Sequence, residues 1–198
     1  MSESKTEKEL QKQEESAEKL MKKVKSSERG VKRYQYFVLR LLLLILVLWV
    51  LFFQIVGLTH MPSGDMYPRV DAGDLVLFYR LDKDVKAQDI IVINKETPDS
   101  EGEKLLYICR VVAVAGDTVD ITDGERLQVN GSTMIESNIF YSTPRYEGFV
   151  EYPLTLGEGE CFVLADSRNG GTDSRYFGPV DKSDILGSVI TIVRRNNL

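Results

Sequence analysis

The sequence predicts a mostly β protein, an antiparallel β domain of about 140 residues carried on a single N-terminal transmembrane helix. Two observations point to this class. An unbroken apolar run, LLLLILVLWVLFFQIVGL, occupies residues 41–58. After residue 67 the chain changes to short segments rich in β-branched and aromatic residues, separated by Gly, Asp and Asn. We therefore expect a charged tail over 1–35, an anchor helix over 36–59 and a β domain over 60–198.

The apolar run has the length of a membrane span. As a helix it would extend roughly 27 Å, close to the hydrocarbon thickness of a bilayer. It is longer than the apolar core of a cleaved signal peptide, and THMPSGDMYP follows it in place of a small-residue cleavage motif. We expect an uncleaved anchor that contacts the lipid bilayer.

Basic residues gather on the N-terminal side of this run: Lys22, Lys23, Lys25, Arg29, Lys32, Arg33 and Arg40. By the positive-inside rule that side is cytoplasmic, so the β domain is expected outside the cell membrane of a single-pass protein. The tail over residues 1–30 is rich in Lys, Glu, Ser and Gln. This composition is typical of either a solvated helix or a disordered segment.

Composition argues against two kinds of site. Residues 41–198 hold 14 Lys and Arg against 23 Asp and Glu, and such an acidic domain is poorly suited to nucleic acid. One His and two Cys cannot build a His-rich or Cys-rich metal site, so we expect no metal. The sequence leaves open whether Cys109 and Cys161 form a disulfide.

Turn residues divide the β domain into short strands. Seven are expected, over 74–80, 89–94, 105–115, 118–122, 126–130, 160–165 and 187–195. The Asn130-Gly131 pair predicts a tight hairpin, because both positions tolerate positive φ. Residues 140–159 are the hardest to assign and are interpreted as a loop with an edge strand.

Three stretches resemble the successive signature boxes of type I signal peptidases, the membrane-anchored Ser/Lys proteases. They are MPSGDMYPRVDAGDLVLFYR (61–80), LYICRVVAVAGDTVDI (106–121) and CFVLADSRNGGTDSRYFGPV (161–180). The resemblance covers roughly residues 36–195. It implies a signal-peptidase-type β fold, a secreted precursor protein as partner and no cofactor.

The positions that carry the family's chemistry are altered in this chain. The first family box reads Ser-Gly-Ser-Met-x-Pro, and Asp65 stands where the second Ser is the nucleophile. Cys109 stands where the family has its general-base Lys, and Gly171 stands where a Ser orients that Lys. The family's third box begins Gly-Asp-Asn-Arg, whereas this chain reads Ala165-Asp-Ser-Arg.

The resemblance assigns roles to the remaining box residues. The peptide-binding or oxyanion-like positions are Ser63, Met66, Tyr67 and Pro68. The positions that support the site are Arg110, Asp166, Arg168, Asp173, Ser174 and Arg175.

The family mechanism does not transfer to these side chains. It needs an alcohol as nucleophile and a neutral amine to take its proton, whereas a carboxylate at Asp65 would repel the developing oxyanion. An aspartic dyad would require Asp166 or Asp173 to share a proton with Asp65, yet the family uses both as support. Cys109 would need to be a thiolate beside an anion, which raises a thiol's pKa.

Ser63 is the remaining candidate nucleophile. It would need a base, and nothing in the sequence brings Lys95 or Lys104 near it. A hydroxyl that bonds to backbone in a turn is the simpler interpretation of Ser63. The sequence therefore favours a degenerate serine endopeptidase without an intact catalytic residue.

The resemblance extends to signal-peptidase-like proteins of the SipA type, which lack the Ser/Lys pair and aid pilus assembly in Gram-positive cells. It implies a chaperone-like protein that binds secreted or pilin precursors in an extended-peptide groove. Asp65 would then pair with a cation of the partner, or internally with Arg110. Two alternatives stay open: an active signal peptidase with displaced catalytic residues, and a structural anchor without a peptide partner.

Overall fold

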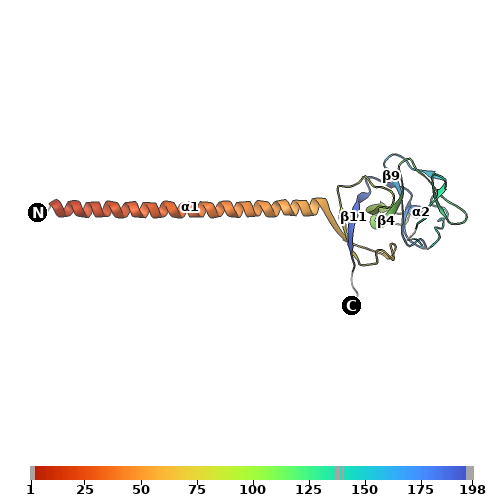
Figure 1. The fold of residues 1–198 in the computed structure, drawn as a ribbon, viewed down its shortest axis with the longest axis horizontal. Helices are drawn as coiled ribbons and strands as arrows, with labels where there is room; N and C mark the ends of the chain where they lie inside the picture. Colours follow the sequence, from red (N-terminus) through yellow and green to blue (C-terminus); the bar gives the residue numbers. More distant parts are fainter. Residues whose placement is uncertain (1–2, 137–138, 140, 195–198) are drawn as a thin grey trace. The chain divides into compact units, whose positions relative to one another are not determined.

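A computed structural model describes residues 3–136, 139 and 141–194. The chain forms two parts, residues 1–50 and residues 51–198, and we call the second the β domain. The predicted fold class is confirmed: the β domain consists mainly of antiparallel strands, and one N-terminal helix is apolar enough to cross a membrane. Figure 1 shows the elements in sequence colours.

Helix α1 runs from Glu3 to Ile55. Its apolar section, Gly30–Ile55, has 26 residues and a mean hydropathy of 2.7, which meets the length and composition of a membrane span. The sequence placed the anchor's end at residue 59, but strand β1 (Val56–His60) already pairs with β2 (Leu75–Tyr79). Strand pairing replaces the helix at Val56, and Gly57 permits this pairing because it lies directly against the ring of Phe78. A Cβ at Gly57 would lie only 2.1 Å from that ring.

The larger of two sheets has seven strands in the order β1-β2-β11-β3-β4-β9-β10, all antiparallel. Beyond β1 and β2 they are β3 (Ile90–Glu96), β4 (Lys104–Val114), β9 (Glu160–Leu164), β10 (Val180–Asp181) and β11 (Ile185–Val193). In Figure 1 green β4 and blue β11 belong to this one sheet, with β3 between them.

The smaller sheet has the order β7-β6-β5-β8. Its strands are β5 (Thr118–Ile121), β6 (Leu127–Val129), β7 (Ser132–Thr133) and β8 (Leu154–Thr155). The predicted hairpin is confirmed: Asn130 and Gly131 have φ of 53° and 75° and join β6 to β7. Strand β8 is the edge strand expected within 140–159.

The period-two alternation of side chains gives the large sheet two buried faces. On β3, Ile91 and Ile93 enter one apolar cluster while Val92 enters another. On β4, Cys109 joins the cluster of Ile91 and Ile108 joins the cluster of Val92. A sheet covered on both faces holds its strand ends firmly, and the loops of the candidate site start from those ends.

Candidate functional site

Three segments far apart in the sequence meet in the β domain: the loop after β1, the middle of β4 and the loop after β9. The backbone N–H of Ser167 donates to the carbonyl of Asp65 at 2.8 Å, and the N–H of Asp166 donates to the sulfur of Met66 at 3.4 Å. The thiol of Cys109 lies 3.9 Å from the carbonyl oxygen of Thr172. The structure therefore brings together all three segments that the sequence singled out.

Asp65 lies half-buried at this meeting point, and its Cβ is 3.8 Å from the position that a Cβ would take at Gly171. Within the described ranges, the Asp65 carboxylate has no hydrogen bond and no ion pair. Asp65 thus lies close to a buried thiol, and no described cation pairs with its carboxylate.

Cys109 is 1% exposed. Burial raises the pKa of its thiol well above the ordinary value, and the nearby carboxylates of Asp173, Asp65 and Asp166 raise it further. The thiol is therefore neutral near neutral pH. A neutral buried thiol is neither a nucleophile nor a proton acceptor, so the position of the family's base holds an inert group.

Cys109 and Cys161 do not approach each other along the ladder. Cys161 pairs with Val114 across β4 and β9, five residues further along β4 than Cys109. That separation is about 16 Å at the rise of a strand, whereas a disulfide needs Cα atoms within about 7 Å. Both cysteines are free.

The lysines considered as bases for Ser63 are engaged elsewhere. Lys95 and Lys104 bind the two carboxylate oxygens of Asp184 at 3.1 and 2.7 Å. The hydrogen bond to Asp184 raises the pKa of Lys104, which is the opposite of what a general base needs. Ser63 itself is half-buried, and its hydroxyl forms no hydrogen bond to any residue in the described part.

Arg110 and Asp166 form a buried, bidentate pair. The Nε and Nη2 of Arg110 donate to the two carboxylate oxygens of Asp166 at 2.7 and 2.6 Å, and Nη1 donates to the carbonyl of Gln88 at 3.1 Å. Both residues are 5% exposed. Arg110 is therefore committed to Asp166, which excludes the internal pairing with Asp65 that the sequence left open.

Asp173 and Arg175 form a second buried pair. The guanidinium donates to both oxygens of Asp173, at 2.9 and 2.7 Å, and the same carboxylate accepts the N–H of Ala165 at 3.0 Å. Asp173 also caps the short helix α2 (Ser174–Phe177) by accepting the N–H of Arg175. This pair fixes the loop after β9 to the helix that follows it.

Ser174 and Arg168 complete the buried polar set. The hydroxyl of Ser174 accepts the N–H of Val163 on β9 at 3.0 Å. Arg168 is fully buried and donates to Thr143 at 3.0 Å and to Glu136 at 2.7 Å. Neutralised or bonded in this way, all six residues predicted as support hold loops in place.

The four predicted contact residues separate into two groups. Tyr67 is 60% exposed and Pro68 is exposed, so both are accessible. Met66 is fully buried and packs in the cluster of Ile108 and Val92. Its side chain cannot reach a peptide unless the loop moves, so the structure does not support Met66 as a contact residue.

The segment over 143–146 covers the site, and sequence reasoning missed it. The hydroxyl of Tyr146 donates to the carbonyl of Gly171 at 3.0 Å, and the Arg175 guanidinium lies 4.3 Å from the ring centroid of Tyr146. The carbonyl of Pro144 accepts from Arg175 at 3.1 Å. No periodicity marks this segment, and Pro144 is the single local signal of an ordered turn.

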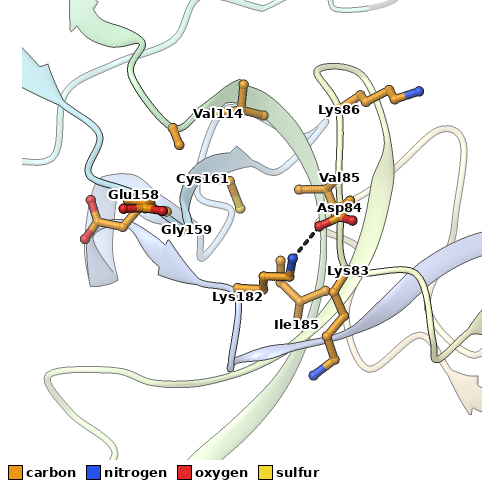
Figure 2. A pocket seen from close by; sticks show the side chains of 12 residues that line it. Lys83, Asp84, Val85, Lys86, Val114, Glu158, Gly159, Cys161, Lys182 and Ile185 are labelled. Carbon is orange, nitrogen blue, oxygen red and sulfur yellow. Dashed lines mark hydrogen bonds and ion pairs between the residues drawn. The ribbon is translucent and has the colours of Figure 1, made fainter.

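A cavity of about 470 Å³ lies apart from these residues. Figure 2 shows its lining, in which Lys182 pairs with Asp84 and to which Cys161 contributes. It holds none of the predicted site residues. Among the described residues, no group of three or more His, Cys, Asp or Glu side chains is placed to hold a metal ion.

Comparison with known proteins decides the family. The model of the family described as "Signal peptidase, peptidase S26" matches residues 31–194. The chain belongs to the peptidase S26 signal peptidase family. The match includes every segment of the candidate site.

Several proteins named as signal or processing peptidases are similar to part of this chain. A probable signal peptidase I-2 of Synechocystis is 29% identical over 133 residues, covering 65% of this chain and 58% of that protein. A probable thylakoidal processing peptidase 2 of Arabidopsis thaliana is 33% identical over 135 residues, covering 64% of this chain and 35% of that protein. The chain thus spans less than two thirds of the length of each of these two relatives.

Two further similarities extend the comparison. The plasmid transfer protein TraF of Escherichia coli is 36% identical over 88 residues, covering 43% of this chain and 47% of TraF. A crystal structure of a signal peptidase I from Enterococcus faecalis is 27% identical, with a TM-score of 0.43, covering 54% of this chain and 97% of that one.

Proposed function

We propose that this signal-peptidase-like protein holds an extended segment of a secreted precursor without cleaving it. One observation carries the proposal: an unpartnered carboxylate, Asp65, stands at the nucleophile's position, close to a thiol, Cys109, that burial keeps neutral. Peptide hydrolysis by a Ser/Lys pair needs an alcohol and a proton-accepting amine, and Asp65 and Cys109 stand at the positions of these two groups.

The charge at Asp65 also opposes the reaction. Amide hydrolysis develops negative charge on the carbonyl oxygen, and an active site stabilises it with donors aimed at that oxygen. A carboxylate within the site works against this stabilisation. Losing a nucleophile and base that act as a unit lowers a protease's rate by roughly 10⁶.

The capacity to bind a peptide does not depend on the missing pair. Residues 104–109 of β4 pair with β3, whereas β9 pairs with β4 only from Arg110 onward. Among the described strands, the first half of β4 therefore has a partner on one side only. Such an edge can accept an extended peptide through main-chain hydrogen bonds.

The anchor supports a role at a membrane. We propose that Gly30–Ile55 spans the bilayer, that the basic N-terminal flank is cytoplasmic and that the β domain is extracytoplasmic. The tail, the anchor and the β domain would then follow one another as the sequence predicts, except that the anchor helix ends at Ile55 and not at residue 59. A secreted precursor would meet the β domain as it leaves the membrane.

We propose a pilin precursor as the partner, in the manner of the SipA-type proteins that this sequence resembles. The support is the replacement of the nucleophile by Asp65. The signal peptidase family acts on secreted precursors at a membrane, and a pilin precursor is one protein of that class.

An active signal peptidase is the competing function. The observation in its favour is that relatives at 29–33% identity are named as peptidases. It would require Ser63 as nucleophile, because Ser63 keeps a hydroxyl without a hydrogen bond in the described part of the site.

One experiment tests both functions. The full chain, in lipid nanodiscs, carries a photo-crosslinking amino acid at Tyr67, which is 60% exposed, or as a matched control at Ile135, which is 94% exposed. A radiolabelled pilin precursor is added, and crosslinked and cleaved products are separated on a gel. We expect crosslinking from residue 67 and intact precursor. Efficient cleavage that Ser63→Ala abolishes would reject the proposal, and absence of any crosslink at residue 67 would favour a structural anchor.

A further inference from the structure

The carboxylates of Asp173, Asp65 and Asp166 all help to raise the pKa of the Cys109 thiol, and two of the three are neutralised by arginines. Arg110 binds both oxygens of Asp166, and Arg175 binds both oxygens of Asp173. Asp65 is the third, and no described residue supplies it with a cation. The site thus carries one uncompensated negative charge.

Several cations of the β domain have other partners, and Arg69, in the same loop as Asp65, is exposed and forms no ion pair with it in the described structure. Lys95 and Lys104 bind Asp184, Arg168 binds Glu136, and the Nη2 of Arg194 donates to the carbonyl of Pro68. A change of rotamer at any of these residues would break an existing bond in order to reach Asp65. A partly buried carboxylate gains most from a cation that brings no such loss, and a bound ligand can supply one.

The free half of β4 lies beside this charge. A Cβ at Gly171 would lie 3.8 Å from the Cβ of Asp65, and the thiol of Cys109 lies 3.9 Å from the carbonyl oxygen of the next residue, Thr172. Asp65 therefore lies near the Cys109 end of this half of the strand. Side chains of an extended peptide alternate between two faces, so a peptide paired with β4 would direct every second side chain to one face. Its backbone would set the register, and one side chain would face Asp65.

We propose that Asp65 binds a cationic side chain, lysine or arginine, of the extended peptide. The inference rests on the proposed peptide-holding function and gives it a specificity. Where an active protease has a nucleophile, this protein has a receptor for positive charge. A precursor segment is selected by a basic residue in register with Asp65.

The test uses the full chain in nanodiscs and fluorescein-labelled decapeptides of alanine and serine. Each peptide carries one lysine or one arginine at position 5 or 6, so that both faces of an extended strand are sampled. The control peptide carries norleucine there, which keeps the length of lysine without its charge. Binding is measured by fluorescence anisotropy.

For one of the two positions, we expect the cationic peptide to bind at least about tenfold more tightly than the norleucine peptide. Asp65→Asn should remove this difference, and Glu158→Gln, an exposed carboxylate in the cavity of Figure 2, should keep it. The preference should weaken as salt rises from 0.05 to about 0.5 M.

A charge-reversal variant tests the same inference in case Asp65→Asn fails to fold. Asp65→Lys should bind a decapeptide with glutamate at the favoured position more tightly than the lysine peptide. Equal binding of cationic and norleucine peptides by the unaltered protein would overturn this inference and leave the peptide-holding function intact. Failure of every peptide to bind would reject both.

Discussion

The methyl group of Ala165 lies 2.4 Å from the position that a Cβ would take at Gly171. The carbonyl oxygen of Ser167 lies 2.8 Å from the same point. The family's pattern has Gly where this chain has Ala165, and Ser where this chain has Gly171. The smaller residue of the two therefore stands at the other position in this chain. In the loop after β9 the glycine is thus at position 171 instead of position 165. The methyl group of Ala165 fills the space that a Ser side chain at position 171 would need.

This exchange predicts a coupled pair of substitutions. Gly171→Ser alone should destabilise the protein by about 1–3 kcal/mol, because the loop must shift to admit the side chain. Adding Ala165→Gly should recover part of the loss, so the two effects will not add. Urea unfolding followed by circular dichroism measures each variant. Strict additivity would show that the loop relaxes without contact between the two positions.

Restoring the family's chemistry should need four substitutions. Asp65→Ser, Cys109→Lys and Gly171→Ser supply nucleophile, base and orienter, and Ala165→Gly makes room for the last. Burial at position 109 would lower the pKa of the new lysine and favour its neutral form. We expect precursor cleavage from the fourfold variant, more slowly without Ala165→Gly, and none when Asp65 is retained. A folded fourfold variant without cleavage would mean that the peptide edge has also diverged.

The buried pair of Arg110 and Asp166 predicts that removing one partner destabilises the protein more than removing both. Arg110→Met leaves a carboxylate buried without its cation and should cost about 3–5 kcal/mol of unfolding free energy. The double variant Arg110→Met with Asp166→Leu should cost less, since no isolated charge remains. Lys95→Met serves as a control, because Asp184 keeps Lys104 as a partner. A double variant as unstable as the single one would show that shape rather than charge dominates here.

The two cysteines predict a fall of stability at alkaline pH. Burial raises the pKa of Cys161 to about 12 and raises that of Cys109 well above its ordinary value. Above about pH 9 the unfolded chain loses thiol protons that the folded protein keeps, so stability falls with rising pH up to about pH 12. The slope should be shallower in Cys161→Ala and Cys109→Ala. Iodoacetamide should label the native thiols slowly at pH 8 and the unfolded ones quickly, and rapid labelling of native Cys109 would contradict its neutral, buried state.

Much of the β domain could be predicted from its sequence because local patterns and packing agree there. Alternation on β3 and β4 places their side chains on the two faces of a covered sheet, and Asn130-Gly131 forms the turn that its residues favour. The start of β1 was missed because Val56–His60 continues an apolar helix pattern, and only pairing with Leu75–Tyr79 ends the helix. Pairing with a distant strand is not visible in local periodicity.

The contacts among the residues singled out as a candidate site could not be predicted from the sequence. The box resemblance singled out Asp65, Cys109 and Gly171, and the structure brings the three segments together. That Arg110 serves Asp166 rather than Asp65 depends on the register of β4 against β9, which composition does not encode. Tyr146 was missed because its contacts, a hydrogen bond to Gly171 and a ring face against Arg175, join segments 25 or more positions apart.

The open side of β4 has a consequence for the protein when it is alone. An unpaired strand edge is a template for any extended chain, including another copy of itself. Lys104 and Glu103 place opposite charges where this edge begins, and Leu105 beside them is 43% exposed. At high concentration such molecules would associate edge to edge, so overproduction of this protein should lead to self-associated forms of it.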